Sequence, residues 1–374
     1  MNAAKSTLKN ILFLRSLRKH KWGGVEKWMF EVGKGLREKG YNVIYGARPG
    51  SRFNDYAKEH SFIYYDIKFS SDINPIISNN LRKIIKNENI DLICTGEEKE
   101  LRLLAPVCWF GERPAIVIRK GLSLIKDRWR FKIIYDMMVD RIITPSNALA
   151  DELLDLLPWL DKEKISVIHN GISIPDNVNK GIFRSDINIE NNTFLISVIG
   201  RFSKQKGHEY LIEALKNIKD KLEDTIVVFV GDGEEKSRNV EKVRKYDLGA
   251  IVKFVGHRWD IGNILTDTDL LIHPSLYEGM PNTILEAMSY STPVLATNIP
   301  GVDEIDMGEK VIELVEPENS EALADKILML KSNPEYRIEL GRKGRTHVSK
   351  HFSLERMLTG VEKTLLKTVN NSEK

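Results

Sequence analysis

The alternation of two kinds of segment constrains the fold of this chain most. Short apolar runs, each the length of a buried strand, alternate with longer segments in which apolar residues recur at helical spacing. After the run at residues 10–14, for example, Trp28, Val32 and Leu36 recur every four residues before Gly40 ends the helix. Strands that alternate with helices in this way form a parallel sheet with helices on both faces.

The alternation runs through the first half of the chain, breaks, and starts again. A polar stretch without periodicity, residues 176–192, follows the turn pair Asn170-Gly171. A chain of 374 residues is also long for one domain. We therefore expect an α/β protein with two Rossmann-like domains, residues 1–175 and 191–352, a linker at residues 176–190 and a terminal helix at residues 353–374. The expected strands are residues 10–14, 42–45, 91–95, 115–118, 141–144, 165–168, 193–199, 225–230, 251–255, 270–273, 293–296 and 311–314.

The composition excludes several classes of protein. Hydrophobic residues make up 42% and charged residues 29%, as in an ordinary soluble globular protein. Two cysteines are too few for a disulfide framework, and no apolar run approaches the ~20 residues of a membrane span. We also expect no signal peptide. The net charge of +3 is unevenly spread, because residues 1–180 carry +8 and the rest −5. The first half is therefore expected to meet an anionic partner, such as a membrane surface, a phosphorylated acceptor or nucleic acid.

Residues 273–288 are the most informative segment. They follow an expected buried strand, so they lie at a carboxyl strand end, where open α/β sheets bind ligands. Pro281 suits the first position of a helix, which we expect to begin near residues 279–282. The backbone N–H groups of Gly279, Met280 and Asn282 and the positive end of the helix dipole then point out of the sheet edge.

Two glutamates frame this helix start. Glu278 precedes it, and a carboxylate there accepts hydrogen bonds, which suits a ligand rich in hydroxyls. Glu286 lies eight residues on, among apolar neighbours, and needs a partner if it is buried. Each residue also has a plainer interpretation, Glu278 as a cap for nearby backbone and Glu286 as a solvated helix position.

A second motif follows the first strand of the second domain. Gly200 allows a sharp turn at the strand end, and Arg201 offers a planar fork for phosphate oxygens. Lys206 adds a point charge five residues later, and Gly207 marks the start of a new helix. A diphosphate leaving group needs such compensating charge. The alternative is a basic loop with a helix-capping glycine.

Taken together, these motifs resemble those of the retaining glycosyltransferases with the GT-B fold, in which two Rossmann-like domains face each other across a cleft. The resemblance rests on Glu-x7-Glu after His-Pro-Ser and on Gly-Arg…Lys-Gly, and it covers nearly the whole chain. It implies that Glu278 holds hydroxyls of the transferred sugar and that Glu286 holds the donor ribose. It also implies that Arg201 and Lys206 contact the donor diphosphate, and that the terminal helix packs back on the N-terminal domain.

The resemblance assigns further positions in both domains. The family has a Gly-Gly loop facing the donor, which matches Gly23 and Gly24, and a loop beside the nucleobase, which matches the segment with His257. Many relatives also carry a histidine after the fourth strand of the N-terminal domain. This sequence has Arg119 and Lys120 there, so these cations are the candidates on the acceptor side.

Several alternatives are weaker. Asp267-Thr-Asp269 matches the metal-binding Asp-x-Asp of a different glycosyltransferase architecture, but it lies at a helix end and a strand start, so we expect a structural role and no metal. A dinucleotide-binding motif at Gly231 and Gly233 lacks its third glycine, since Lys236 stands there. A sugar-nucleotide epimerase of the same architecture and a non-catalytic sugar-nucleotide-binding module stay open. Nucleic-acid binding is not supported, because the basic half lacks interleaved aromatic residues.

The resemblance implies a hexosyltransferase that needs no metal or other cofactor. Its donor is a nucleotide-diphosphate sugar, with UDP favoured over GDP, and its acceptor a glycan or a lipid-linked saccharide of lipopolysaccharide, capsule or exopolysaccharide synthesis. We expect a cytoplasmic protein, attached peripherally to the inner face of the membrane through its basic residues. These residues are Lys9, Arg15, Arg18, Lys19, Lys21, Arg119, Lys120, Lys126, Arg128, Arg130 and Lys132.

Overall fold

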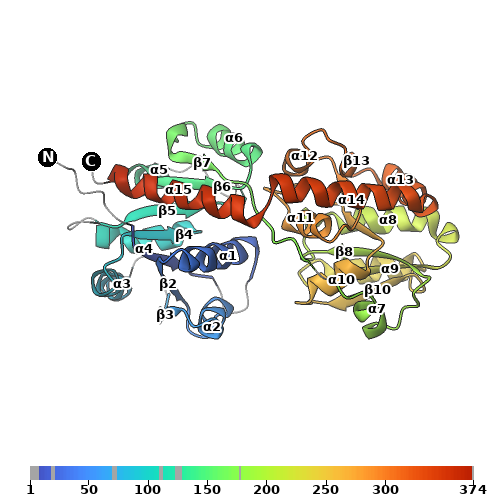
Figure 1. Ribbon diagram of the computed structural model, residues 1–374, viewed down its shortest axis with the longest axis horizontal. Helices are drawn as coiled ribbons and strands as arrows, with labels where there is room; N and C mark the ends of the chain where they lie inside the picture. The colour runs from blue at the N-terminus through green and yellow to red at the C-terminus, as the bar shows by residue number, and fades with distance from the viewer. Residues whose placement is uncertain are drawn as a thin grey trace. The chain divides into compact units, whose positions relative to one another are not determined.

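Two parallel sheets organise the chain. The structure is a computed structural model that describes residues 8–17, 22–69, 74–108, 113–122, 129–176 and 178–372. It divides into unit 1, residues 1–170 and 355–374, and unit 2, residues 171–354. In each unit, helices flank the sheet on both sides (Figure 1). The expected fold class, an α/β protein of two Rossmann-like domains, is confirmed.

Unit 1 has a seven-stranded sheet with the order β3-β2-β1-β4-β5-β6-β7. Its elements are β1 (Asn10–Leu14), α1 (Gly24–Glu38), β2 (Asn42–Ala47), α2 (Arg52–Glu59), β3 (Ile63–Asp66), α3 (Pro75–Asn87), β4 (Leu92–Thr95), α4 (Glu98–Cys108), β5 (Ala115–Arg119), α5 (Trp129–Met138), β6 (Arg141–Thr144), α6 (Asn147–Leu156), β7 (Ile165–Val167) and α15 (Leu354–Ser372).

Unit 2 has a six-stranded sheet with the order β10-β9-β8-β11-β12-β13. Its elements are α7 (Ile182–Asp186), β8 (Phe194–Ile199), α8 (His208–Ile218), β9 (Thr225–Val230), α9 (Lys236–Lys245), β10 (Val252–Gly256), α10 (Ile261–Asp267), β11 (Leu270–His273), α11 (Asn282–Ser289), β12 (Val294–Thr297), α12 (Pro300–Asp306), β13 (Glu313–Val315), α13 (Ser320–Ser332) and α14 (Pro334–His351).

Both sheets reverse their strand order beside the first strand of the unit. In unit 1 the reversal lies between β1 and β4, and in unit 2 between β8 and β11. Neighbouring strands pair in parallel, and β1 and β8 are apolar runs with buried residues on both faces. At such a reversal the loops beyond the two strands diverge and leave a crevice, which is where open α/β sheets bind ligands. The topology therefore places one ligand-binding edge in each unit.

The last helix of the chain belongs to unit 1 from residue 355 onward. Gly35 of α1 leaves room for the side chain of Leu358, since a Cβ at this glycine would lie 2.4 Å from a Leu358 methyl carbon. Tyr41 donates a hydrogen bond to Glu362 over 3.0 Å. A small residue on α1 thus lets α15 pack closely against it.

Some expected boundaries differ from those observed. The edge strand β3 was not expected, because its residues are mostly exposed and their sequence shows no apolar alternation. The strand expected at residues 311–314 is β13, Glu313–Val315; Asp306 instead accepts hydrogen bonds from the N–H groups of Val311 and Ile312. Within residues 176–190, expected as a linker, lies α7. Asp267 accepts hydrogen bonds from the backbone of Phe183 in this helix.

Candidate active site

Two loops meet at the strand reversal of unit 2. One connects β8 to α8, and the other connects β11 to α11. The N–H of Leu276 donates to the carbonyl of Gln205 over 2.7 Å, and the Gln205 amide donates to the carbonyl of Tyr277 over 2.9 Å. Gly207 has a φ of 60°, and a Cβ there would lie 2.0 Å from the carbonyl oxygen of Pro274. Only glycine fits this close approach without a shift of the backbone.

The closed loops bring together a lysine and a glutamate 72 residues apart. The ammonium of Lys206 lies 2.5 Å from Oε1 of Glu278, and these side chains are 19% and 10% exposed. The Ser275 hydroxyl donates to the same oxygen over 3.0 Å. Burial alone would raise the pKa of Glu278, but Lys206 and His273 outweigh it and lower this pKa to about 2. Glu278 is therefore a fixed carboxylate at neutral pH.

His273 lies beneath this pair at the end of β11. Its Nε2 is 3.0 Å from the Ser275 hydroxyl and 3.4 Å from Oε1 of Glu278. Burial lowers the pKa of His273 and lowers that of the neighbouring His208 to about 3, with Lys206 acting in the same direction. Both imidazoles are therefore neutral at pH 7. Lys206 is therefore the cation beside Glu278 and the two imidazoles. A ligand anion at this position could replace Glu278 as the partner of Lys206.

Arg201 lies on the surface at the start of the first loop. Its guanidinium is 62% exposed and pairs with Glu234 over 2.8 Å. Exposed ion pairs contribute little to stability, so this one can break readily when a stronger anion arrives. Gly200 lies against the Lys206 stem, with an ideal Cβ 3.5 Å from it. The two predicted phosphate-binding cations thus come from one loop, one exposed and one paired.

The helix that follows Glu278 begins within the expected range, residues 279–282. Pro281 is the N-cap rather than the first helical residue, and α11 begins at Asn282. Met280 is buried, and Glu286 is half-buried within α11. The carbonyls of Glu278 and Gly279 pack against Gly301 of α12, where a Cβ would lie 2.4 Å from the first of them. The loop that carries the predicted sugar contacts therefore packs directly against α12.

The position predicted beside the nucleobase lies at the end of β10. His257 is exposed, and its ring packs edge-on against that of Trp259 with centroids 4.5 Å apart. Gly256 before it has a φ of 72°. This aromatic pair comes from the far side of β8 relative to Glu278, since the strand order is β10-β9-β8-β11.

The aspartates of the Asp-x-Asp sequence hold α7 in unit 2. Asp267 accepts hydrogen bonds from the backbone N–H groups of Gly181 and Phe183 over 2.5 and 2.8 Å. Asp269 pairs with Arg184 over 2.7 Å. Their oxygens fasten α7 to the sheet, which is a structural role.

In unit 1 the predicted glycine pair lies at the start of α1. Gly23 is the N-cap and Gly24 the first helical residue, and both are exposed. Three residues after the N-cap, Glu26 turns inward and accepts hydrogen bonds from Arg15, the residue that follows β1, with Nε and Oε1 2.7 Å apart. Arg15 is buried and also lies 3.7 Å from Glu100. This ion cluster was not predicted, because its members are separate polar residues in the sequence.

Arg119 and Lys120, the acceptor-side candidates, are both buried at the end of β5. Arg119 donates to the carbonyl of Lys120 and to Oδ1 of Asn170, each over 2.7 Å, and its guanidinium lies 4.9 Å from the Trp28 ring centre. Burial lowers the pKa of Arg119 to about 9. Lys120 pairs with Glu98. Both cations are thus paired within unit 1.

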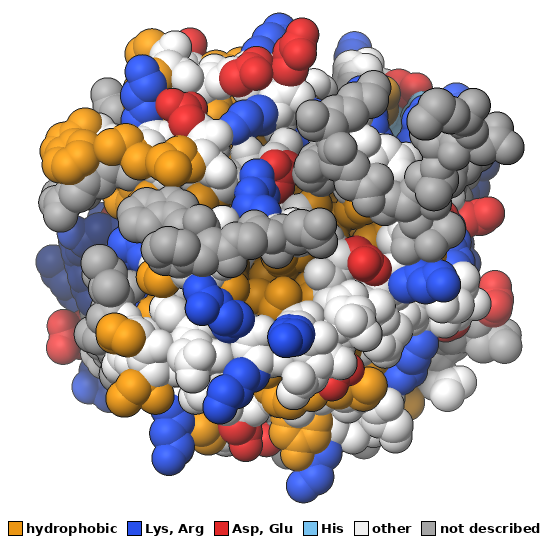
Figure 2. Space-filling model, turned by 90° about the vertical axis from the view of Figure 1, so that its left-hand side faces the viewer, with side chains coloured by type: hydrophobic (Ala, Val, Ile, Leu, Met, Phe, Trp, Pro, Cys, Tyr) orange, Lys and Arg blue, Asp and Glu red, His pale blue; other side chains and the backbone are white. Residues whose placement is uncertain are grey.

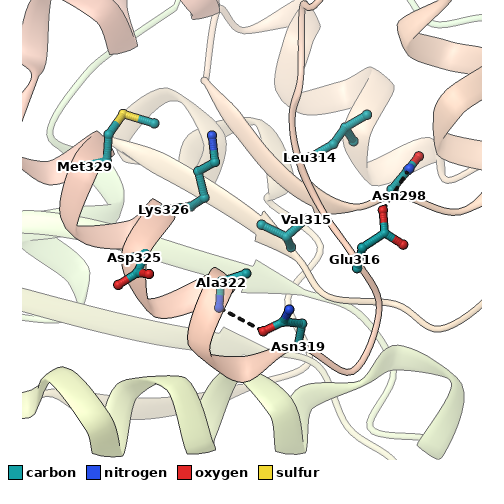
Figure 3. Close-up of a pocket in the computed structure, with 9 residues that line it drawn as sticks. All are labelled: Asn298, Leu314, Val315, Glu316, Asn319, Ala322, Asp325, Lys326 and Met329. Carbon is teal, nitrogen blue, oxygen red and sulfur yellow. Dashed lines mark hydrogen bonds between the residues drawn. The ribbon is translucent and has the colours of Figure 1, made fainter.

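A groove of about 580 Å³ lies beside the candidate site in unit 2. Figure 3 shows side chains of α13 on one wall and residues at the ends of β12 and β13 on the other. The groove lies next to the loop that carries Glu278. Asn298, in the groove, follows Thr297 of β12, and the Thr297 hydroxyl donates a hydrogen bond to the carbonyl of Ser275 in that loop. It is lined by Asn298, Leu314, Val315, Glu316, Asn319, Ala322, Asp325, Lys326 and Met329.

Comparison with known proteins agrees with this arrangement. The family model described as glycosyl transferases group 1 matches residues 179–347, and the glycosyltransferase family 4 model matches residues 22–174. A glycosyltransferase of Methanocaldococcus jannaschii, itself uncharacterized, is 30% identical over 75% of this chain and 77% of its own length. The chain belongs to the group 1 glycosyltransferases.

Other relatives of this group 1 glycosyltransferase carry more specific names. UDP-Gal:alpha-D-GlcNAc-diphosphoundecaprenol alpha-1,3-galactosyltransferase of Escherichia coli is 31% identical over 63% of this chain, and the match spans 64% of that relative, less than two thirds of its length. Among solved structures, a glycosyltransferase of Rickettsia africae has a TM-score of 0.84 at 24% identity, covering 97% of this chain and 99% of that one. HepE of Anabaena, in complex with UDP and glucose, has a TM-score of 0.82 at 21% identity over 96% and 99%. These two structures show the shared GT-B fold.

Proposed function

We propose that this protein is a retaining, metal-independent hexosyltransferase that moves a sugar from a UDP-sugar to a glycan or lipid-linked acceptor of cell-surface polysaccharide synthesis. The observation that carries the proposal is the Lys206–Glu278 pair at the strand reversal of unit 2, with neutral His273 and Ser275 around it. UDP is favoured over GDP because HepE, a neighbour in fold, was solved with UDP. The lipid-linked acceptor is suggested by the name of the E. coli relative.

The geometry suits exchange of one anion for another. In the free protein Glu278 neutralises Lys206. When a donor binds, its diphosphate can take over the lysine together with Arg201, and Glu278 turns its acceptor oxygens to sugar hydroxyls. The half-buried setting makes these charged contacts stronger than they would be in bulk water. In this proposal the negative charge that develops on the leaving diphosphate is stabilised where it appears.

Retention follows from front-face attack in this proposal. Glu278 is assigned to the sugar hydroxyls, so it is not the nucleophile at the anomeric carbon. The acceptor oxygen approaches on the side from which the diphosphate leaves, and a leaving-group oxygen takes the acceptor proton. The C–O bond to the diphosphate breaks as the new glycosidic bond forms, and the protein contributes positioning and charge stabilisation.

A donor screen tests the proposal. Full-length protein with UDP-sugars and GDP-sugars should give a rise in melting temperature with a small set of UDP-sugars. The same donors should be transferred to undecaprenyl-diphosphate saccharides or short glycans in the presence of excess chelator, with the donor anomeric configuration kept in the product by NMR. Inversion would refute retention, and loss of activity restored by Mg²⁺ or Mn²⁺ would refute metal independence. Epimerised sugar nucleotide without transfer would identify the epimerase, and binding without turnover the non-catalytic module.

Peripheral attachment to an anionic membrane, on the cytoplasmic face, is the second part of the proposal. Along α5, Trp129, Ile133 and Met137 are 71%, 44% and 51% exposed. Their spacing of four residues places them on one helix face, beside the exposed Lys132. Figure 2 shows Lys and Arg side chains spread among hydrophobic ones on an end face of the molecule.

The cluster predicted for this attachment needs correction. Arg15, Arg119 and Lys120 are buried, so they cannot contact lipid. Arg18, Lys19, Lys21, Lys126 and Arg128 lie outside the described residues, as does the side chain of Arg130. In the part of the chain that the structure describes, no helix is long and apolar enough to cross a bilayer.

Sedimentation with vesicles containing anionic lipid tests the attachment. Wild type should pellet at low salt and be released by high salt, because the attraction to the surface is electrostatic. A Trp129→Ala, Ile133→Ala double variant should stay in the supernatant. Ile76→Ala, which changes a residue that is 73% exposed on another helix, α3, should pellet like wild type. Wild type that stays in solution at low salt would refute the attachment while leaving glycosyl transfer untouched.

A further inference from the structure

Three potential metal ligands lie together in unit 2, outside the candidate active site. Glu309 follows α12, and His347 and His351 lie four residues apart on α14. One ligand atom from each lies within 4.8 Å of the others. Histidines at this spacing project from one helix face, an arrangement that metal-binding helices use.

Each ring nitrogen of His347 faces a different oxygen. Its Nε2 lies 2.7 Å from the carbonyl oxygen of Ile305, which can only accept, so Nε2 carries a proton. Its Nδ1 lies 3.1 Å from Oε2 of Glu309. Because a neutral imidazole has only one N–H, its Nδ1 lone pair would face a carboxylate oxygen.

His351 completes the cluster, because its ring centre lies 4.8 Å from that of His347. One ligand atom from each of the three side chains therefore faces the same small space. We propose that Glu309, His347 and His351 bind a divalent transition-metal ion, with Zn²⁺ the best match to two imidazoles and a carboxylate.

The geometry agrees with such a site. Ligand atoms about 2.1 Å from a tetrahedral ion are about 3.4 Å from one another, close to the 3.1 Å between Nδ1 and Oε2. The widest separation allowed by the cluster, 4.8 Å, exceeds this, and the exposed Glu309 side chain is free to adjust. The Ile305 carbonyl holds the second nitrogen of His347, as outer-sphere partners of metal-bound histidines commonly do. Water would complete the fourth position.

The site connects to the candidate active site through α12. Near its start, Gly301 of this seven-residue helix packs against the carbonyls of Glu278 and Gly279. Near its end, Ile305 accepts the hydrogen bond from His347. Only four residues, about 6 Å of helix, separate the two contacts. A bound ion would therefore fix the helix that braces the Glu278 loop, as a structural element that takes no part in the transfer reaction.

Calorimetric titration of chelator-treated, full-length protein with ZnCl₂ tests the site. We expect saturable binding at one site per chain and a melting temperature about 5 °C or more higher in excess Zn²⁺. Mg²⁺ should give neither effect, because it prefers oxygen ligands. Glu309→Gln should weaken Zn²⁺ binding by at least about tenfold. This exposed substitution avoids the risk that a change at buried His347 unfolds the protein.

Asp303→Asn is the matched control, because Asp303 is an exposed acid on the neighbouring α12 and is not one of the three ligands. It should bind Zn²⁺ like wild type. Absence of a saturable site in wild type, or equal binding by wild type and Glu309→Gln, would overturn the proposal. Both measurements are independent of transfer activity, so they leave the proposed function to its own test.

Discussion

The two units use charge differently at equivalent places in their folds. In unit 2, Lys206 lies at the strand reversal with a single carboxylate, Glu278, and both remain partly exposed. In unit 1, Arg15 follows β1 at the corresponding reversal, buried against Glu26 and Glu100. The same topology therefore holds two kinds of cation. Lys206 of unit 2 can exchange its carboxylate for another anion, whereas Arg15 of unit 1 is fixed between buried carboxylates.

This difference indicates what each edge can bind. Lys206 can bind a diphosphate in place of Glu278. Glu278 can then accept hydrogen bonds from sugar hydroxyls, so neither charge is left buried without a partner. The unit 1 cluster has more carboxylates than cations, since Glu97 also lies 3.8 Å from Arg15. It therefore offers an incoming anion no excess positive charge. We infer that the donor diphosphate binds at the unit 2 edge, and that the exposed Gly23 and Gly24 of unit 1 can offer the donor only uncharged backbone contacts.

The largest effect is expected from breaking the unit 1 cluster. Arg15→Met should cost about 3–5 kcal/mol of unfolding free energy, because it leaves buried carboxylates without their counter-ion. Lys39→Met, which removes a partly exposed ion pair with Glu362 in the same unit, should cost at most about 1 kcal/mol. Urea unfolding measures both. An Arg15→Met variant that is as stable as Lys39→Met but inactive would mean that Arg15 binds a ligand. The proposed difference between Arg15 and Lys206 would then be wrong.

The next largest effect concerns the exchangeable cation of unit 2. Lys206→Ala should lower kcat about 10²–10³-fold, as loss of a charge-stabilising donor does, while the protein stays folded. Lys204→Ala removes an exposed lysine of the same loop and should keep wild-type kinetics. Steady-state assays with the donor found by the screen provide the comparison. Equal rates for the two variants would remove Lys206 from the site.

The sequence predicted the strands of both sheets, except the edge strand β3, and the loops that carry the candidate site. Apolar runs and their spacing were sufficient for this, because parallel strands are buried on both faces. The partnership of Lys206 with Glu278 was not predictable, since it depends on a close approach between Gly207 and Pro274 that only the folded loops create.

The unit 1 cluster could not be foreseen for a related reason. Arg15 and Glu100 are polar residues in different motifs, and nothing in their local sequence indicates that both are buried. The same holds for Arg119 and Lys120, which were predicted on the acceptor side and in the basic cluster, and which the structure buries. Contacts between strand ends depend on sheet order, and hydrophobic patterning does not encode that order.

Substitutions of Glu278 and Glu286 should affect different kinetic parameters. Glu278→Gln should lower kcat about 10–100-fold, because charged hydrogen bonds to the moving sugar are lost. Glu286→Gln should instead raise the donor KM by about tenfold and weaken binding of free UDP, in keeping with a ribose contact. Titration calorimetry with UDP checks the second statement. Normal UDP affinity in Glu286→Gln would make its ribose role wrong.

The smallest effect concerns acid stability, and it reports on the Lys206–Glu278 pair without any substrate. The pKa of Glu278 is about 2, below its usual value of 4.5, because Lys206 and His273 outweigh its burial. A depressed carboxylate pKa adds stability above pH 4.5, and this contribution is lost as pH falls from about 4.5 to 2. The unfolding free energy of wild type should therefore fall more steeply than that of Lys206→Met between pH 6 and pH 3. The difference should be on the order of 1–2 kcal/mol, measured by urea unfolding.

Lys204→Met is the control, because it removes an exposed lysine that does not contact Glu278, and it should keep the wild-type slope. An unchanged slope in Lys206→Met would mean that the pair does not form in solution, and the exchange of partners proposed for unit 2 would lose its starting state.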